Sequence, residues 1–299
     1  MKYLVTGGAG FIGSNIVKLL VKNGHKVIVV DNLHTGNLER IKDVKDQISF
    51  FNVDIRNINS LKSKINGIDG IFHQAALTVV SESFEKSDEY YDVNVNGTKN
   101  IFEIARQLEI KVVFASSSSV YGNVNEIPIK ENSILNPINP YGKTKVEKEK
   151  LAKNYWDRGV QIIGLRYFNV YGIGQTGSYA GVITQFLKRL NSNLPPIIHG
   201  KGNQIRDFIS VRDVAEANLK SMESNTNNGF FNIGTGKSIS ILQLAKIMIS
   251  ISSKNLGPIF DDELLGDVEK SQADTSLSSE KINWKYNIDL SEGLEELFQ

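Results

Sequence analysis

The chain has 299 residues, 40% of them hydrophobic, which is enough to bury a substantial core in one large or two medium domains. Its 34 basic and 33 acidic residues are interspersed and give a formal net charge of +1, so the composition carries no electrostatic footprint for nucleic acid or an anionic membrane and favours a small-molecule partner. The absence of cysteine excludes a disulfide framework, a thiolate nucleophile and a cysteine-bound metal.

The chain is expected to start directly with a strand. Its first apolar run is interrupted at Gly7, far too early for a signal peptide or a spanning helix, so a cytoplasmic location is expected. Further strands are predicted where β-branched residues cluster, at 26–30, 48–53, 70–75, 111–116 and 161–170. Runs of this kind are typical of strands buried on both faces of a parallel sheet.

Segments with helical spacing alternate with these strands. They cover 11–24, 58–65 and 87–109, and a further helix is expected from Pro140 to Trp156 because proline suits the first helical turn. The alternation predicts a βαβ series, and therefore an α/β fold with a Rossmann-type doubly wound parallel sheet.

The second half of the chain has a less regular pattern. Glycines, Pro195-Pro196 and short elements dominate until an amphipathic helix at 239–251. We expect a dinucleotide-binding domain over 1–166 and a smaller α+β substrate-binding lobe over 167–299, with segments of the lobe crossing back to the first domain.

A glycine-rich segment, TGGAGFIG, follows the first predicted strand and opens the first helix. Gly7 permits a tight turn, Gly10 lets the backbone approach a pyrophosphate, and Gly13 allows helix and strand to pack closely, with the phosphates at the positive end of the helix. The glycine pattern is a weak signal alone, but the flanking strand and helix make it a strong prediction of a dinucleotide site.

Acidic residues end the second and third predicted strands. Asp31 lies 18 residues beyond Gly13, where a carboxylate can accept both ribose hydroxyls and repel a 2′-phosphate, so NAD is favoured over NADP. Asp54, in NVDIR, either contacts adenine or caps the following loop, and its position does not decide between the two.

Tyr141 and Lys145 lie four residues apart on one face of the helix that begins at Pro140. To act as a base near pH 7, a tyrosine must lower its pKa by about 3 units, or about 4 kcal/mol. A neighbouring ammonium and a positive nicotinamide ring both favour the phenolate. By itself the spacing is more often a surface pair. However, the serines at 116–119 close a strand at the carboxyl edge of the sheet, where ligands of doubly wound folds bind.

Taken together, TGGAGFIG, Asp31-Asn32, SSSSVYG (116–122), YGKTK (141–145) and LRYFNVYG (165–172) resemble the extended short-chain dehydrogenases/reductases, specifically the NAD-dependent epimerase/dehydratase family. The motifs occur in the family's order over nearly the whole chain. The resemblance implies NAD as the cofactor, a sugar nucleotide as the substrate and a homodimer in which helices 87–109 and 140–156 pair with their copies.

The resemblance also implies residue roles. Tyr141 is similar to the catalytic base, Lys145 to the residue that binds the nicotinamide ribose and lowers the Tyr pKa, and Ser117 to the assisting hydroxyl. Asn94 is similar to a helix residue that contacts the cofactor or positions Lys145. The expected cofactor contacts are Gly7, Gly10, Phe11, Ile12, Gly13, Asp31, Asn32, Asp54, Ile55, Gln74, Ala75, Ala76, Asn94, Tyr141, Lys145 and Tyr167, and the expected substrate contacts are Ser117, Tyr141, Asn169, Arg206, Asp267 and Ser271.

Ser118 and Ser119 decide among the family's reactions. Sugar 4,6-dehydratases carry an Asp-Glu pair at these positions because elimination of water needs a further acid and base, and the nucleotide-sugar decarboxylases usually carry a Glu in place of Ser119. We therefore expect 4-epimerisation of a UDP-hexose through a 4-keto intermediate. Another sugar-nucleotide epimerase or a 4,6-dehydratase is the alternative. A non-catalytic NAD-sensing protein is disfavoured because it would not need the Ser117, Tyr141 and Lys145 set.

The substrate half gives mixed signals. Arg206, in RDFISVRDVA, resembles the arginine that binds the diphosphate, and its planar fork suits a doubly charged ligand. Leu264 stands where the family often has a further arginine before Gly266-Asp267, which weakens the prediction of UDP. Ser271 stands where some epimerases have a bulky tyrosine, so the N-acetylhexosamine pair stays open as a substrate. No His, Asp or Glu cluster has metal-ligand spacing, so no metal is expected. His73, at a buried strand end, is expected to be structural.

Overall fold

A seven-stranded sheet organises the protein in the computed structural model, which describes residues 1–176, 181–263 and 268–299. All neighbouring strands are parallel, in the order β11-β6-β5-β4-β1-β2-β3. The strands are β1 (Lys2–Thr6), β2 (Lys26–Asp31), β3 (Ile48–Asn52), β4 (Gly70–His73), β5 (Lys111–Ser117), β6 (Ile162–Tyr167) and β11 (Gly229–Ile233). The doubly wound Rossmann-type fold is confirmed.

The strand order reverses between β1 and β4, which pair directly. From β1 the chain continues outward to β2 and β3, whereas β4 is followed on its other side by β5 and β6. In open α/β sheets, ligands bind beyond the carboxyl ends of the strands at such a reversal. The glycine turn after β1 and the segment Gln74–Ala76 after β4 therefore flank the expected crevice.

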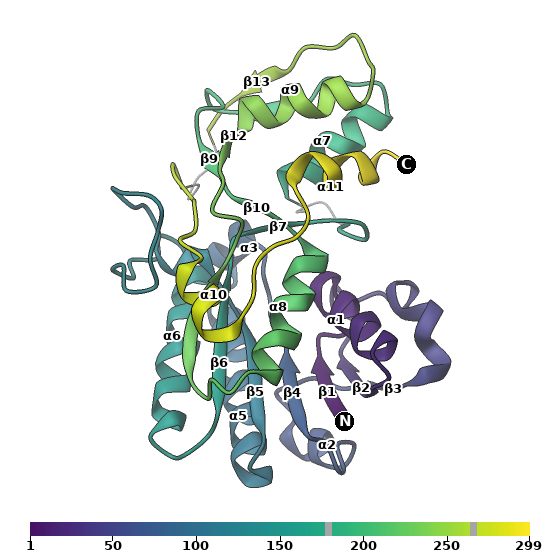
Figure 1. Cartoon of the computed structure of the whole chain (residues 1–299), viewed down its shortest axis with the longest axis vertical. Coiled ribbons are helices and arrows are strands. Elements are labelled where there is room, and N and C mark those ends of the chain that lie inside the picture. The colour runs from purple at the N-terminus through teal and green to yellow at the C-terminus, as the bar shows by residue number, and fades with distance from the viewer. Residues whose placement is uncertain (177–180, 264–267) are drawn as a thin grey trace.

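Helices cover both faces of the sheet (Figure 1). α1 (Phe11–Lys22) and α8 (Val211–Glu223) pack on one face, whereas α5 (Gly97–Leu108) and α6 (Pro140–Trp156) pack on the other. Strand residues alternate between the two cores: Leu4 faces the α5–α6 side and Val5 faces the α1–α8 side. Because both faces of the inner strands are buried, these strands are largely apolar, with polar residues such as His73, Ser116 and Arg166 near their carboxyl ends.

The smaller part of the molecule lies beyond the carboxyl ends of the strands, at the top of Figure 1. Its core is built by α7 (Val182–Asn191), α9 (Ile241–Ile251) and α11 (Leu290–Leu297) together with β8 (Ile197–His199) and β10 (Phe208–Ser210). Short strand pairs complete it: β7 (Asn169–Tyr171) with β10, β9 (Ile205–Arg206) with β12 (Ile239–Ser240), and β8 with β13 (Ile259–Asp261). The remaining elements are η1 (Leu38–Gln47), α2 (Ile58–Lys62), α3 (Val80–Glu85), η3 (Ser118–Val120) and α10 (Ser276–Ile282).

The expected helix over 87–109 is interrupted. It consists of α4 (Ser87–Tyr91), a wider π-helical turn η2 (Asp92–Asn96) and α5. Within that turn, the Asn94 side chain hydrogen-bonds the backbone of Leu77 and the hydroxyl of Thr144. Side-chain contacts with other segments thus accompany the local change of winding, which helical periodicity does not reveal.

Three further departures concern the second half of the predicted pattern. The strand expected over 161–170 leaves the sheet after Tyr167, because Asn169 pairs instead with the backbone of Asp207. Helices α7 and α8 were not expected from the irregular pattern after residue 167. Finally, β11 adds a seventh strand beside β6, so a segment from late in the chain completes the first sheet.

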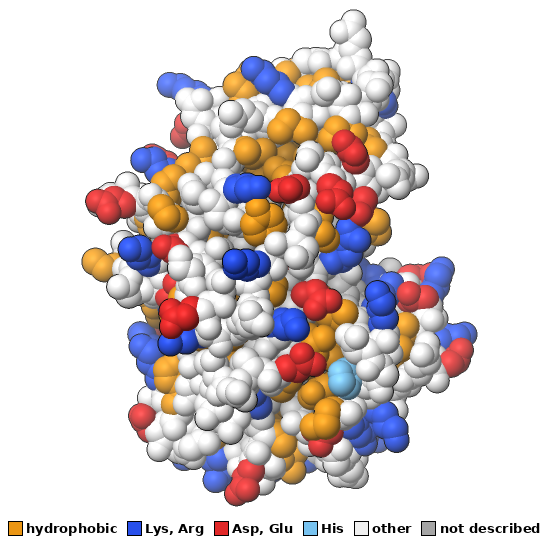
Figure 2. Space-filling view, in the orientation of Figure 1, with side chains coloured by type: hydrophobic (Ala, Val, Ile, Leu, Met, Phe, Trp, Pro, Cys, Tyr) orange, Lys and Arg blue, Asp and Glu red, His pale blue; other side chains and the backbone are white. Residues whose placement is uncertain are grey.

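Basic and acidic side chains are interspersed on the face of the molecule shown in Figure 2, without a large area of one sign. Across the described ranges, none of the helices combines the length and the apolar character needed to cross a membrane.

Candidate active site

The turn after β1 has the geometry of a phosphate cradle. Gly7 has a φ of +68°, and a Cβ there would lie 2.7 Å from the backbone nitrogen of Ala75. A Cβ on Gly13 would overlap the carbonyl oxygen of Gly7, so helix and turn touch through backbone alone. Gly10 is the N-cap of α1 and has no side chain to cap the helix. The first-turn amides of α1, at Phe11, Ile12 and Gly13, are therefore directed at a site that favours an anion.

The Asp31 carboxylate closes this cradle at the end of β2. Its two oxygens accept hydrogen bonds from the amides of Ala9 (3.0 Å) and Leu33 (2.8 Å). Burial raises the pKa of Asp31, and these hydrogen bonds oppose the rise. Each oxygen has a second lone pair, so the carboxylate can still accept hydroxyls. An acidic group beside a glycine cradle fits the ribose of NAD and disfavours an added phosphate.

Asn32 and Asp54 meet at the neighbouring strand ends. The Asn32 amide donates to Asp54 Oδ2 at 3.1 Å, and Arg56 bonds both oxygens of the same carboxylate. These bonds, with that from Arg56 first, lower the pKa of Asp54 to about 2. The contacts agree with the loop-capping interpretation of Asp54, and an adenine contact stays a prediction. Ile55 is buried, and its Cδ1 lies 2.6 Å from where a Cβ on Gly97 would be.

The three residues expected to be catalytic come together where β5 ends and α6 begins. α6 starts at Pro140, and its N-cap Asn139 accepts the amide of Gly142 at 2.8 Å. In the first turn of the helix, the phenol of Tyr141 lies close enough to Ser117, at the end of β5, for that hydroxyl to lower its pKa. Lys145 lies a turn further on, with its Nζ 5.3 Å from the centre of the Tyr141 ring and 3.1 Å from the carbonyl oxygen of Ala115.

The charges of these groups depend on their burial. Burial raises the pKa of Tyr141 to about 12, against the opposing effect of the Ser117 hydrogen bond. Burial also lowers the pKa of Lys145 to about 8, against the opposing charge of Glu149. The phenol is therefore protonated at neutral pH in the protein alone, and a phenolate needs a further positive charge beside it.

The polar segment after β4 connects the cradle to α6. Gln74, Ala75 and Ala76 follow β4 directly and are half-buried. Asn94 Nδ2 donates to Thr144 Oγ1 at 3.0 Å, which places Asn94 against the residue that precedes Lys145. His73 is fully buried, with its two ring nitrogens bonded to the hydroxyls of Thr6 (2.7 Å) and Thr98 (2.8 Å), as expected of a structural histidine.

The Tyr167 hydroxyl lies within a buried network on the α8 side of the sheet. It donates to Gln74 Oε1 at 3.1 Å and accepts from Asn218 Nδ2 at 2.8 Å. Asn218, in α8, is fully buried and was not identified from the sequence. Its neighbours in RDFISVRDVAEANLK give no local sign of this contact, because α8 reaches β6 only through the fold.

Three of the expected substrate residues, Asn169, Arg206 and Ser271, lie in β9 or beside it. Arg206 is buried and donates to the carbonyl of Ile205, which also accepts the amide of Ser271 at 3.1 Å. Asn169 Nδ2 donates to the carbonyl of Asp207 at 3.2 Å. The structure thus brings Asn169, Arg206 and Ser271 into one region. Asp267, Leu264 and Gly266 lie outside the described residues.

Asp207 holds this region together and was not identified from the sequence. Its carboxylate, fully buried, accepts the amides of Thr235 (2.8 Å), Gly236 (2.9 Å) and Ala273 (3.1 Å). Burial raises its pKa, and these bonds oppose the rise. One carboxylate therefore ties β9 to the segment after β11 and to the chain that follows Ser271.

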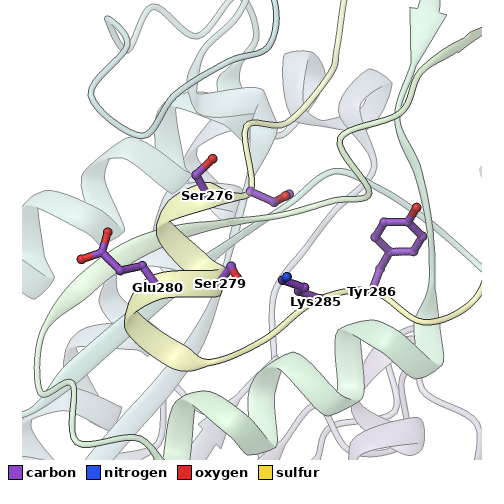
Figure 3. A pocket seen from close by; sticks show the side chains of 6 residues that line it. Ser276, Ser279, Glu280, Lys285 and Tyr286 are labelled. Carbon is purple, nitrogen blue, oxygen red and sulfur yellow. The ribbon is translucent and has the colours of Figure 1, made fainter.

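A surface hollow of about 610 Å³ lies elsewhere, against α10 and the segment that follows it (Figure 3). It is lined by Thr275, Ser276, Ser279, Glu280, Lys285 and Tyr286, none of which is a candidate site residue. Within the described part of the chain, no three His, Asp or Glu side chains are grouped so that they could hold a metal ion.

A doubly wound parallel sheet with a glycine cradle after β1, serines at the end of β5 and a Tyr-Lys pair at the start of α6 defines a protein of the short-chain dehydrogenase/reductase type. Residues 3–234 match the model of the NAD dependent epimerase/dehydratase family, which is more than half of the chain. The chain therefore belongs to this family.

Individual relatives agree with this assignment over their full length. A Methanocaldococcus jannaschii protein, named provisionally as a UDP-glucose 4-epimerase, is 43% identical over 97% of this chain and 95% of its own. The structure of the Thermotoga maritima UDP-glucose 4-epimerase with UDP-glucose superposes with a TM-score of 0.94 at 35% identity and covers 100% of this chain and 98% of that one. The UDP-N-acetylglucosamine 4-epimerase of Methanobrevibacter ruminantium M1, in complex with UDP-N-acetylmuramic acid, gives 0.93 at 34% identity, covering 99% and 96%.

Proposed function

We propose that this protein is an NAD-dependent isomerase that interconverts UDP-glucose and UDP-galactose by inversion at C4. The observation that carries the proposal is the convergence of Ser117, at the end of β5, with Tyr141 and Lys145, whose Nζ lies 5.3 Å from the centre of the Tyr141 ring. The neighbouring Ser118 and Ser119 offer no carboxylate, so the site is equipped for oxidation and reduction at one carbon but not for elimination.

The residues present fit NAD. The uncapped first turn of α1 suits the pyrophosphate, and Asp31 suits the adenosine ribose. Gln74 and Ala75 lie against the Gly7 turn, which supports a cofactor contact for the segment Gln74–Ala76, and Lys145 suits the second ribose. When bound, NAD supplies the acceptor and then the donor of one hydride, so that net redox is zero and the cofactor stays with the protein.

The protein's own residues handle the proton. Tyr141 accepts the proton of the C4 hydroxyl as the carbinol becomes a ketone, and it returns that proton when the opposite face is reduced. Ser117 hydrogen-bonds the same sugar oxygen and holds it against Tyr141. The ammonium of Lys145 stabilises the phenolate between the two steps. Arg206, with Asn169, binds the diphosphate of the nucleotide. Ser271 contacts the sugar, and Asp267 is proposed as a further substrate contact.

The N-acetylhexosamine pair is a second candidate substrate. Ser271 is a small residue in the region of Arg206, and a small side chain leaves room for a substituent at C2 of the sugar. The relative from Methanobrevibacter ruminantium is itself named as an epimerase of UDP-N-acetylglucosamine. An epimerase acting on another nucleotide sugar is the alternative within the same family.

A panel of nucleotide sugars tests this function. The purified protein should retain NAD, seen by absorbance and by fluorescence after reduction, and should invert UDP-galactose to UDP-glucose, with the N-acetylated pair assayed beside it. Conversion of no UDP-hexose by protein that holds NAD would contradict the proposal. Inversion of only a different nucleotide sugar would keep the chemistry and replace the substrate.

We further propose a cytoplasmic enzyme of galactose metabolism that works as a homodimer, paired through α4, α5 and α6. Tyr91 in α4 and Leu108 in α5 support this pairing because they are large apolar side chains, 47% and 45% exposed. Sedimentation should give a dimer that Leu108→Glu weakens. The division into an NAD-binding domain (1–166) and a sugar-nucleotide lobe (167–299) also stays a proposal, with α8 and β11 as its crossing segments.

A further inference from the structure

A buried carboxylate joins β5 and α6, which carry the candidate catalytic residues, to the neighbouring strand β6. Glu149, in α6, accepts Ser116 Oγ at 2.6 Å and Arg166 Nε at 2.9 Å on Oε1, and Arg166 Nη2 at 2.7 Å on Oε2. Ser116, Glu149 and Arg166 are 2%, 2% and 3% exposed. None of the three was identified from the sequence as a site residue.

Each member of this cluster adjoins a candidate site residue. In the β5–β6 register, Ser116 lies opposite Arg166 and the next pair is Ser117 opposite Tyr167. Successive residues of a strand face opposite sides of a sheet. Ser116 and Arg166 therefore lie on the α6 side, and Ser117 and Tyr167 follow them at the carboxyl ends of the two strands. On α6, Glu149 lies one turn beyond Lys145, which lies one turn beyond Tyr141.

Arg166, the other half of the ion pair, also makes hydrogen bonds to further residues. Arg166 Nη1 donates to the hydroxyl of Tyr121 and to the carbonyl of Glu131, both at 2.8 Å. Tyr121 donates in turn to Asn232 Oδ1, in β11, at 2.6 Å. A buried ion pair is a weak source of stability, because desolvation offsets most of the attraction. An ion pair whose nitrogens and oxygens are all hydrogen-bonded instead holds α6, β5 and β6 in one register.

The charge of Glu149 also acts on Lys145. From α6, Lys145 is faced by Tyr141, Lys148 and Glu149, from β4 by His73, and from β5 by the carbonyl of Ala115. Arg166, from β6, is linked to Lys145 through its ion pair with Glu149. Lys148 Nζ shares the Ala115 carbonyl at 3.4 Å, so two amines converge on one acceptor. The carboxylate of Glu149 offsets their mutual repulsion and the loss of water.

We propose that Glu149, braced by Arg166 and Ser116, is a positioning residue for the epimerase reaction: it fixes Ser117 and Tyr141 in register and holds a carboxylate one helical turn from Lys145. The catalytic part of this role rests on the proposed function. The effect on Lys145 belongs to the protein itself and is measurable without any sugar.

The isosteric variant Glu149→Gln removes the charge and keeps the shape: its amide oxygen can still accept from Ser116 and from Arg166 Nε, although the bond from Arg166 Nη2 is lost. We expect the pKa of Lys145, read from the Cε resonance of labelled lysine and assigned by its loss in Lys145→Met, to fall by about one unit. In turnover assays, the pH at which kcat declines on the alkaline side should fall by the same amount, while KM for the sugar changes little.

Two variants serve as controls. Glu147→Gln removes a carboxylate from the same helix, where it pairs with Lys150 at 2.8 Å on the surface, and should leave both readouts unchanged. Ser116→Ala breaks one hydrogen bond without changing the charge of the cluster. It should lower kcat severalfold without moving the pH at which kcat declines. If Glu149→Gln fails to fold, Glu149→Gln combined with Arg166→Gln removes both charges, and the lysine titration is repeated there.

An unchanged Lys145 pKa in folded Glu149→Gln would overturn the proposal, and so would an equal change in Glu147→Gln. These outcomes are independent of the proposed function. A wild-type protein that shows the lysine shift but inverts no UDP-sugar would contradict the function alone.

Discussion

The two faces of strands β5 and β6 bury polar groups in opposite ways. Against α6 the sheet buries charges: Lys145, Lys148, Glu149 and Arg166 are all 3% exposed or less. Against α8, beside the candidate site, it buries neutral groups, where the Tyr167 hydroxyl, Gln74 and Asn218 bond one another. The buried Lys111 on this side lies at the far end of β5, where it donates to the carbonyls of Met222 and Ser224. The same pair of strands therefore supports two different kinds of interior.

The difference follows from what each face does. Burying charge is costly, and replacing a buried ion pair with apolar residues is often neutral or stabilising. A neutral network with every bond made fixes geometry at less cost. We infer that charge is kept on the α6 face because a reacting phenol needs it, whereas neutral bonds are enough to hold the strands on the α8 face. Charged groups on the α6 face should therefore serve the rate at a cost in stability, and Asn218 on the α8 face should serve stability.

Tyr141→Phe should have the largest effect. Without the phenol oxygen, the C4 hydroxyl has no base, and we expect conversion to fall by about 10³-fold. Retained NAD and the free energy of unfolding should change little, because the ring remains. Product formation from UDP-galactose, measured beside cofactor content, checks this. Full activity in the variant would remove Tyr141 from the mechanism.

Lys148→Met should show that charge on the α6 face costs stability. Burial, with the charge of Lys145, holds the pKa of Lys148 well below its usual value, so the unfolded chain binds more protons than the folded one. Stability due to this group therefore rises with pH between the depressed pKa and about 10.5. At pH 7 the variant should be about 2 kcal/mol more stable in urea unfolding.

The control is Lys153→Met, which changes an exposed lysine of the same helix. It should leave unfolding unaffected. If Lys148→Met instead destabilises the protein at every pH, the amine is a net stabilising partner of the Ala115 carbonyl, and the contrast between the two faces is weaker than stated.

Asn218→Ala should lower stability without altering the reaction. It leaves the Tyr167 hydroxyl with Gln74 as its remaining partner and removes the bond to the Val214 carbonyl. We expect the free energy of unfolding to fall by about 2 kcal/mol. Turnover by folded, NAD-loaded protein should stay within about twofold of wild type. A large loss of turnover with normal stability would place chemistry on the α8 face as well.

His73 should give the smallest effect, visible only in acid. Burial, with the charges of Lys148 and Lys145, lowers its pKa well below 6.5, so the unfolded state gains a proton first as pH falls. Stability should drop by about 1.4 kcal/mol for each pH unit below about 6.5, down to the depressed pKa. His73→Gln, which can still bond Thr98, should flatten this slope. An equal slope in the variant would assign acid lability to other groups.

Features that depend on neighbours in the chain could be predicted from the sequence. The cradle at Gly7–Gly13, the acidic end of β2 at Asp31 and the start of α6 at Pro140 all follow from local steric and capping rules, and the structure has them where expected. The motifs around Ser117 and Tyr141 could be placed because strand and helix ends meet at one edge of a parallel sheet.

Features that depend on distant segments could not. Asn218 and Arg166 lie in ordinary helical and strand patterns, and their roles come from contacts 51 and 17 residues away in the chain. The π-helical turn around Asn94 is accompanied by side-chain bonds to Leu77 and Thr144. The carboxylate of Asp207 was passed over beside Arg206, because nothing local shows that three amides from other segments converge on it.

The pairing of β11 with β6 has a consequence for synthesis. When a ribosome has released the first 170 residues, the outer side of β6 has no neighbour, and its backbone groups can pair with any extended chain nearby. The nascent half must wait some 60 residues more for its own partner, which makes this edge the point of greatest aggregation hazard before completion. A fragment cut at residue 166 should therefore need a chaperone or precipitate, whereas one ending after Ile233 has its edge covered.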